Sequence, residues 1–359
     1  MRRRLSAGLA LIATVASLRT AAFAKDAAPA VAFLDGDAGR AAIVDESIEP
    51  YFSVLQPIEM TAKTGKPLEA KDLAAQRDEC RKRYAAAVLD FTADEKAALS
   101  AFTAEVGAAW ASEYPLFSKT PWSFIKLADS VEAGLPHTRG RSIVFAPSVT
   151  EAFAKSWKSD PKAALVGAAR LLVHEQSHVV QRLHPEAFAP LYTGVWGFVR
   201  AKDLASDAWL DKQHLGNPDG IDIGWAFPMK EGPTTTLIQP LVVFSEGPEP
   251  RNMPNDMQMI AVTLERKAGK LKPKEDAKGH PVFRSMALSG VDSLFGGIGE
   301  TFHPNEIFAC LFAAMVTRDH FHGGPLSRSS DLVGKDFAKL RPWCREHFTS
   351  KEPASVGEK

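Results

Sequence analysis

Two histidines and a glutamate stand together in the stretch His174-Glu175-Gln176-Ser177-His178, and these side chains suit metal-assisted chemistry. Residues four apart are separated by about 400° around an α-helix, so the two imidazoles would lie on one face, one above the other. In that arrangement they can bind one divalent cation, and Glu175 would lie beside its open side, where it can accept a proton from bound water. The spacing predicts a metal site with Glu175 as general base.

The surrounding residues predict the helix that must carry this stretch. Asp160 is a suitable N-cap, and Pro161 fits the first turn, where its missing N–H has no consequence. His184-Pro185 marks the end, because the residue before a proline is disfavoured in the α conformation. We therefore expect a helix over residues 161–183. Imidazoles and a carboxylate buried in such an apolar helix need a partner, which a metal ion would supply.

A catalytic zinc ion usually has three protein ligands and one open position, so a third ligand is required. Glu306 is the preferred candidate, because it falls in the first turn of a second apolar helix that Pro304 would begin. His184 is the alternative, since it follows the second histidine at the spacing of the longer motif H-E-x-x-H-x-x-G-x-x-H. Gln181 occupies the position of the glycine in that motif. If the helix continues through Gln181, His184 lies roughly 240° round the axis from the second histidine and faces away.

Hydrolysis at such a centre also requires a donor for the negative charge that develops on the substrate oxygen. Tyr192 and His320 are candidates, together with His303 and Arg318. His303 and His320 have a simpler interpretation, as residues at a helix end or on the surface. The expected cofactor is one Zn²⁺ ion, inferred from the ligand types, although another divalent ion could take its place.

Cys80, Cys310 and Cys344 are the three cysteines of the chain. They lack a spacing such as C-x-x-C, so the predicted metal site is not based on thiolates. At most one disulfide can form. Cys80 with Cys344 is the preferred pair, because Cys310 lies in an apolar helical run.

The first 24 residues predict a secretory signal peptide. Met1-Arg2-Arg3-Arg4 is basic, Leu5 to Leu18 is mostly apolar, and Ala22-Phe23-Ala24 is a typical cleavage site. The apolar run is too short to span a bilayer, and no later segment suits that purpose. We expect a periplasmic or secreted protein that has no membrane segment after cleavage. The formal net charge of zero gives no indication of binding to nucleic acid or to an anionic membrane.

The order of the patterns predicts an α+β fold. Residues 25–113 are expected to form a mostly helical N-terminal region, with helical spacing from Ser47 to about Ala111 and a short strand near Val31. Residues 114–348 are expected to form the catalytic domain. A β-rich insertion at about 217–290, with lysines of a solvated loop near 267–278, would interrupt it, and residues 349–359 would form a flexible tail.

Two strands are expected shortly before the metal helix, at Trp122–Leu127 and Ser142–Phe145. The second could form a sheet edge beside a cleft and pair with an extended substrate. An ordinary internal strand explains the same residues equally well.

The His174–His178 stretch, together with Asn305-Glu306-Ile307-Phe308-Ala309 at the start of a later helix, resembles the gluzincin metallopeptidases, which share the thermolysin-like arrangement. The resemblance covers two helices, with Ser142–Phe145 as weaker support. It implies a zincin-like core, in which a small sheet packs against the active-site helix. It further implies His174, His178 and Glu306 as zinc ligands, Glu175 as general base, and a peptide or protein as substrate.

The chain departs from that family in two respects. The segment between His178 and Glu306 is much longer than in thermolysin, so a β-rich insertion must fold between them. Cys310 replaces the acidic residue that orients a zinc-bound histidine, so the partner of His174 must come from elsewhere. Two other interpretations stay open: a catalytically silent binding protein with a structural metal, and a zinc hydrolase of a non-peptide amide or ester.

Overall fold

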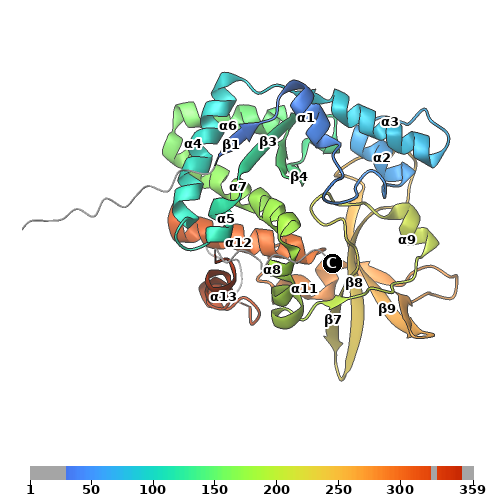
Figure 1. The fold of residues 1–359 in the computed structure, drawn as a ribbon. Helices are drawn as coiled ribbons and strands as arrows, with labels where there is room; N and C mark the ends of the chain where they lie inside the picture. The colour runs from blue at the N-terminus through green and yellow to red at the C-terminus, as the bar shows by residue number, and fades with distance from the viewer. Residues whose placement is uncertain (1–29, 325–329, 350–359) are drawn as a thin grey trace, which may run out of the picture.

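The computed structural model describes residues 30–324 and 330–349, which form an α+β structure (Figure 1). This confirms the predicted fold class at that level. The predicted signal peptide, residues 1–24, lies outside the described residues, as do residues 350–359 of the predicted tail. Within the described ranges, no helix has the length and apolar character needed to cross a membrane.

A small mixed sheet packs against the predicted metal helix. Its strand order is β1–β3–β5–β4, and β2 pairs with β3 in addition. The first three strands of that order are parallel, and β4 and β2 are antiparallel to their neighbours. The bounds are β1 (Val31–Phe33), β2 (Val88–Leu89), β3 (Trp122–Leu127), β4 (His137–Arg139) and β5 (Ser142–Phe145).

The predicted strand Ser142–Phe145 is confirmed as β5, but its proposed place at a sheet edge is wrong. It lies between β3 and β4, and β4 holds the edge position. The chain turns back at Gly140, so a second short strand covers β5 on its outer side. The alternative interpretation, an ordinary internal strand, is the correct one.

Helix α7 (Pro161–Leu183) lies between this sheet and α12 (Pro304–Phe321) in Figure 1. Helix α7 has the predicted bounds, α12 begins at Pro304 as predicted, and the two helices pack directly against each other. Almost every residue of α12 from Glu306 to Thr317 is buried, because the helix is enclosed by α7 and by aromatic side chains from several other elements. The bounds of the remaining helices are α1 (Gly36–Ile43), α2 (Pro57–Thr64), α3 (Leu73–Ala86), α4 (Ala93–Trp110), α5 (Pro115–Lys119), η1 (Glu132–Gly134), α6 (Pro147–Ser159), α8 (Pro185–Pro190), η2 (Leu191–Val195), α9 (Ala208–Gln213), α10 (Met286–Ser289), α11 (Val291–Leu294), η3 (Lys335–Phe337) and α13 (Leu340–His347).

A second, antiparallel sheet is built from the segment between α7 and α12, as the sequence predicts. Its strand order is β10–β9–β8–β7–β6, and β11 pairs with β9 as well. Strands β7 and β8 form the hairpin that extends away from the helices in Figure 1, and the long strand β9 pairs with the other side of β8. The bounds are β6 (Val199–Arg200), β7 (Trp225–Glu231), β8 (Thr234–Phe244), β9 (Met257–Lys267), β10 (Lys270–Pro273) and β11 (Phe283–Ser285).

Three local predictions are wrong. Residues 47–56 form turns rather than a helix, because α2 begins only at Pro57, after a capping box at Gln56. The lysine-rich residues 267–278 include strand β10, which pairs with β9 through backbone hydrogen bonds that the lysine pattern does not disclose. Cys80 and Cys344 do not form a disulfide; all three cysteines are free and buried, and these two belong to different hydrophobic clusters.

Candidate metal centre

The structure brings His174, His178 and Glu306 together, as the sequence predicts. The Nε2 atoms of the two histidines are 3.1 Å apart, and Oε2 of Glu306 lies 3.4 Å from each of them. Ligands held about 2.0–2.1 Å from a tetrahedral ion are themselves about 3.3 Å apart. The spacing of these three donor atoms therefore fits one divalent metal ion, and the protein has a group that could bind one.

Two helix beginnings place these ligands. Asp160 caps α7 by accepting hydrogen bonds from two backbone N–H groups, and this helix then carries both histidines on one face. His303 caps α12 by accepting from the backbone N–H of Asn305, which sets Glu306 in the first turn. A carboxylate in the first helical turn is stabilised by the positive end of the helix dipole. The caps thus fix the ligands in register along two packed helices.

His178 is held by Gln181, one turn further along α7. Its Nδ1 lies 2.9 Å from the side-chain oxygen of Gln181, whose NH₂ group donates to the Tyr192 hydroxyl and to the Asn305 carbonyl. Because an amide oxygen can only accept, the His178 Nδ1 must carry a proton, so Nε2, on the side of Glu306, is the nitrogen that can bind a metal ion. Gln181 therefore fixes the tautomer that a metal ligand requires.

Glu306 is held by a turn from the inserted segment. The Asn217 side chain donates to Oε1 of Glu306 over 3.1 Å, so that Oε2 is the oxygen that faces the histidines. The turn is itself fastened, because Asp219 accepts from the backbone and the hydroxyl of Thr138 on β4. Asn305 in addition donates to the Asp219 carbonyl. The hydrogen bonds of Asp219 also occupy the middle of the β4 edge.

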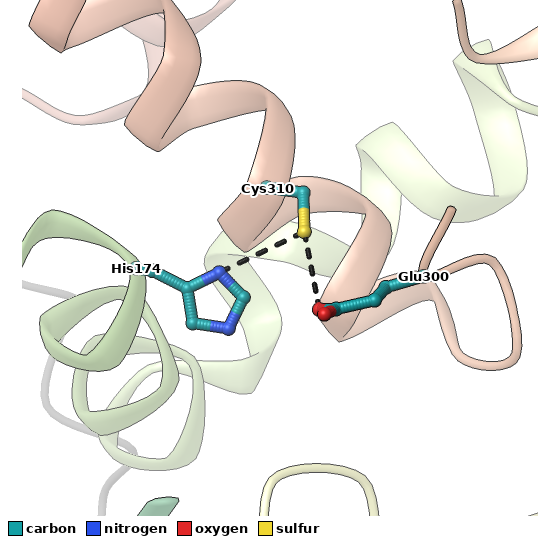
Figure 2. Close-up of side chains that lie close together, drawn as sticks. All are labelled: His174, Glu300 and Cys310. Atoms are coloured by element: carbon teal, nitrogen blue, oxygen red, sulfur yellow. Dashed lines mark hydrogen bonds between the residues drawn. The ribbon is translucent and has the colours of Figure 1, made fainter. Parts of the chain in front are cut away.

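His174 has a thiol as the neighbour of its other ring nitrogen, as Figure 2 shows. Sγ of Cys310 lies 3.7 Å from Nδ1 of His174 and donates to Oε2 of Glu300 over 3.3 Å. Cys310 lies one turn after Glu306 on α12, whereas Glu300 is on the exposed loop before that helix. Burial first, and the charge of Glu300 next, raise the pKa of the Cys310 thiol well above its usual range, so it stays protonated.

Glu175 has the surroundings of a general base. Its side chain is only 3 % exposed, and Oε2 has no hydrogen-bond partner among the described residues. Burial raises the pKa of this carboxyl to about 8, and the opposing effect of the His174 imidazole is smaller. A carboxylate with a pKa close to neutrality can take up a proton and release it again.

Glu306 and His178, which are buried on facing helices, shift each other's pKa. Burial alone would raise the pKa of the Glu306 carboxyl, but the His178 imidazole and hydrogen bonds from both histidines lower it well below its usual range. Burial alone would lower the pKa of His178, but the charges of Glu306 and then Asp219 raise it to about 10. Carboxylates therefore dominate the electrostatics, which favours a cation between these side chains.

A cavity of about 640 Å³ is lined by two of the three candidate ligands, His174 and Glu306, and by Glu175. The inserted segment contributes Met253, Met257 and Met259 to its lining. Lys63 on α2, Glu132 on η1 and His137 on β4 line it as well. The volume falls within the range typical of sites that enclose a small molecule or part of a chain.

The alternative ligand His184 is not part of this group. It lies at the end of α7, which continues through Gln181 as expected, and its Nδ1 is 3.8 Å from Glu186. The helix thus carries His184 away from the face of the two ligand histidines, for the geometric reason given above.

The four candidate oxyanion donors are all described, and none of them lines the cavity. The Tyr192 hydroxyl is bonded to Gln181 behind His178. Both ring nitrogens of His303 are engaged, one with Asn305 N–H and the other with the Asp222 carbonyl. His320 and Arg318 lie near the far end of α12, beside Glu113 and Asp336 respectively. The positions therefore give no support to these assignments.

Sequence reasoning missed the residues that hold the ligands: Gln181, Asn217, Cys310 and Glu300. Gln181 follows His178 by three, a spacing that places the two side chains side by side on a helix and could have indicated the contact. Asn217 and Glu300 have no such spacing from the residues they contact, and the sequence has no local signal for them. Cys310 stands at the position of the acidic residue that orients a zinc-bound histidine in gluzincins. The expectation that the partner of His174 comes from elsewhere is wrong, because the Cys310 thiol lies beside Nδ1 of His174. His137 was missed as well. It is 4 % exposed, and its Nε2 has no partner among the described residues.

Comparisons with known proteins do not extend these observations. Models of protein families, curated proteins and solved structures were all searched, and none matches this chain. The functional conclusion must therefore come from the residues and their geometry.

Proposed function

We propose that this protein is a zinc-dependent hydrolase, specifically a metallopeptidase with a gluzincin-type site in a zincin-like core. One observation carries the proposal: the donor atoms of His174, His178 and Glu306 converge at tetrahedral spacing, with the buried carboxylate of Glu175 beside them. Helix α7 against a small sheet, with α12 supplying the third ligand, is the arrangement that the resemblance to gluzincins implies.

In this proposal Glu175 moves the proton. The two histidines and Glu306 would hold a zinc ion, which would supply Lewis acidity and bring the pKa of bound water towards neutrality. Glu175 accepts the proton at Oε2, the oxygen that has no other partner among the described residues, and passes it to the leaving nitrogen. Gln181 and Asn217 keep the ligands fixed during this exchange.

The surroundings support a catalytic rather than a purely structural metal. A structural zinc ion is closed by four protein ligands, and His184, the residue that could have supplied the fourth, pairs with Glu186 instead. Two of the ligands, His174 and Glu306, also border a cavity large enough for part of a peptide. With the signal peptide that the sequence predicts, we place the activity in the periplasm or outside the cell, on peptide or protein substrates.

The test combines elemental analysis of the purified full chain with digestion of a peptide library, with and without a chelator. We expect one zinc ion per chain and chelator-sensitive cleavage. Glu175→Gln should retain the metal and lose on the order of 10²–10⁴-fold in rate. Glu151→Gln, at an exposed position of α6, is the matched control and should cleave as the unchanged chain does.

Three results would contradict the proposal in different ways. Undiminished cleavage by Glu175→Gln would refute the assignment of the base. A tightly bound metal without any hydrolysis would favour the silent binding protein. Cleavage restricted to non-peptide amides or esters would keep the metal chemistry and replace the substrate class.

A further inference from the structure

We propose that Cys310 and Glu300 together position His174 as a metal ligand. The Cys310 thiol links the two groups: it donates a hydrogen bond to the Glu300 carboxylate and accepts one from Nδ1 of His174. The inference rests on the metal centre of the proposed function, not on the substrate. Figure 2 shows the three side chains in their order, with the thiol in the middle. The two hydrogen bonds measure 3.7 Å on the histidine side and 3.3 Å on the carboxylate side.

The direction of both hydrogen bonds follows from a count of hydrogens. A thiol has one hydrogen, and Cys310 donates it to Glu300, because a carboxylate can only accept. Sγ can then only accept from the His174 ring, so the ring proton is on Nδ1. Nε2, 3.4 Å from Glu306 Oε2, is consequently the ring nitrogen that can bind a metal ion.

The second ligand histidine, His178, also has a hydrogen-bond acceptor at Nδ1, but this acceptor is an amide oxygen. His178 donates through Nδ1 to the amide oxygen of Gln181. Each ligand histidine therefore has a partner that accepts from Nδ1, one neutral amide and one thiol backed by a carboxylate. Partners of this kind are typical of metal-binding histidines and usually contribute to metal affinity.

The location of Glu300 explains why a thiol can serve here. Glu300 reaches the site from the loop before α12, and donor atoms of His174, Glu300 and Cys310 all lie within 4.8 Å of one another. The larger radius of sulfur lets Cys310, which is 9 % exposed, touch both neighbours from one turn beyond Glu306. An acidic residue at the position of Cys310 would lie beside the Glu300 charge; the thiol avoids that repulsion.

The experiment measures zinc affinity by competition with a chromophoric chelator, independently of any hydrolysis. Cys310→Ala should weaken zinc binding by roughly 10–100-fold, and Glu300→Gln should weaken it by less, because a side-chain amide still accepts from the thiol. In the Cys310→Ala background, Glu300→Gln should add less than about a twofold change, because the relay is already broken. Cys344→Ala is the matched control: this cysteine is also free and buried but lies in α13, and its replacement should leave zinc affinity unchanged.

A second measurement separates positioning from direct ligation. The same three donor atoms could in principle bind a metal themselves. With Co²⁺ in place of zinc, the proposal expects a tetrahedral d–d spectrum without an intense sulfur-to-cobalt charge-transfer band. It also expects Cys310→Ser, which can donate and accept in the same way, to recover most of the affinity lost in Cys310→Ala.

The proposal is overturned by unchanged zinc affinity in Cys310→Ala, by equal effects of Glu300→Gln in both backgrounds, or by a cobalt–thiolate band. Circular dichroism of each variant establishes that the affinity is measured on folded protein. Failure of the proposed function has a different signature, namely tight metal binding without hydrolysis. A chain that binds neither zinc nor cobalt would overturn both proposals at the first titration.

Discussion

The buried ion pair of Lys63 and Glu132 allows a sharp test of how the N-terminal helices support the cavity. Lys63 on α2 is fully buried and Glu132 is 2 % exposed, and the ammonium lies 3.0–3.1 Å from both carboxylate oxygens. Tyr51 and Tyr84 both donate to Oε1 of the same carboxylate. Burial alone would raise the pKa of Glu132, but the charge of Lys63 and these hydrogen bonds lower it, so the group is ionised at neutral pH.

The expected magnitude follows from these contacts. Lys63→Met keeps an apolar stem of similar size but leaves the carboxylate buried without a cation, and breaking such a pair costs about 3–5 kcal/mol. We expect about 3 kcal/mol, at the low end of that range, because the two phenol hydrogen bonds remain. Glu132→Gln should cost a similar amount, since it leaves the ammonium unpaired. The double variant contains neither charge, so its loss should fall short of additivity by about 2 kcal/mol.

The assay is equilibrium unfolding in urea at pH 7 with excess chelator, so that metal binding does not stabilise the native state. Lys158→Met is the control, because Lys158 pairs with Asp94 over 2.5 Å while both side chains are more than half exposed. Its cost should stay below about 1 kcal/mol. Additive losses in the buried pair, or a Lys63→Met cost no larger than that of Lys158→Met, would refute the reasoning.

Two further predictions concern His178 with its partner Gln181, and His214. Gln181→Leu should weaken zinc binding roughly 10–100-fold in a chelator competition, whereas Gln181→Glu, which still accepts from His178, should retain it; equal affinities for both variants would contradict the role of Gln181. Burial first, and then Lys63, lower the pKa of His214 to about 4. The stability that this group contributes is complete above its ordinary pKa of about 6.5 and is lost as the pH falls towards 4, by up to about 3 kcal/mol. Urea unfolding of His214→Gln from pH 7 to pH 4 should therefore show a flatter decline than that of the unchanged chain, and parallel curves would refute the assignment.

Local patterns were sufficient to predict the elements that carry the ligands. The bounds of α7 follow from Asp160, Pro161 and the proline after His184, and the start of α12 follows from Pro304. These signals act within one helical turn, where capping and the geometry of proline decide the outcome. The choice of Glu306 over His184 was also within reach, because it needed only the helical rotation past Gln181.

Strand arrangement was beyond such reasoning. The residues of β5 have the composition of a strand whether it is internal or at an edge, and only the return of the chain through β4 decides between the two. The same holds for β10, whose lysines look like a solvated loop until β9 provides a partner. In both cases the hydrogen-bonding partner is a tertiary feature, and side-chain composition follows it weakly.

In the metal centre, too, local motifs predict one part and tertiary contacts decide the other. Its three ligands come from short motifs, but the group that holds each ligand comes from a different place: Gln181 from the same helix, Asn217 from the inserted segment and Cys310 from the opposite helix. Only the first has a fixed spacing from the ligand it serves. Since Asn217 reaches Oε1 of Glu306 through the turn fastened to β4, the inserted segment must be folded before that ligand is oriented. The long segment between α7 and α12 is therefore part of the centre, because it completes the set of contacts that directs all three donor atoms at one point.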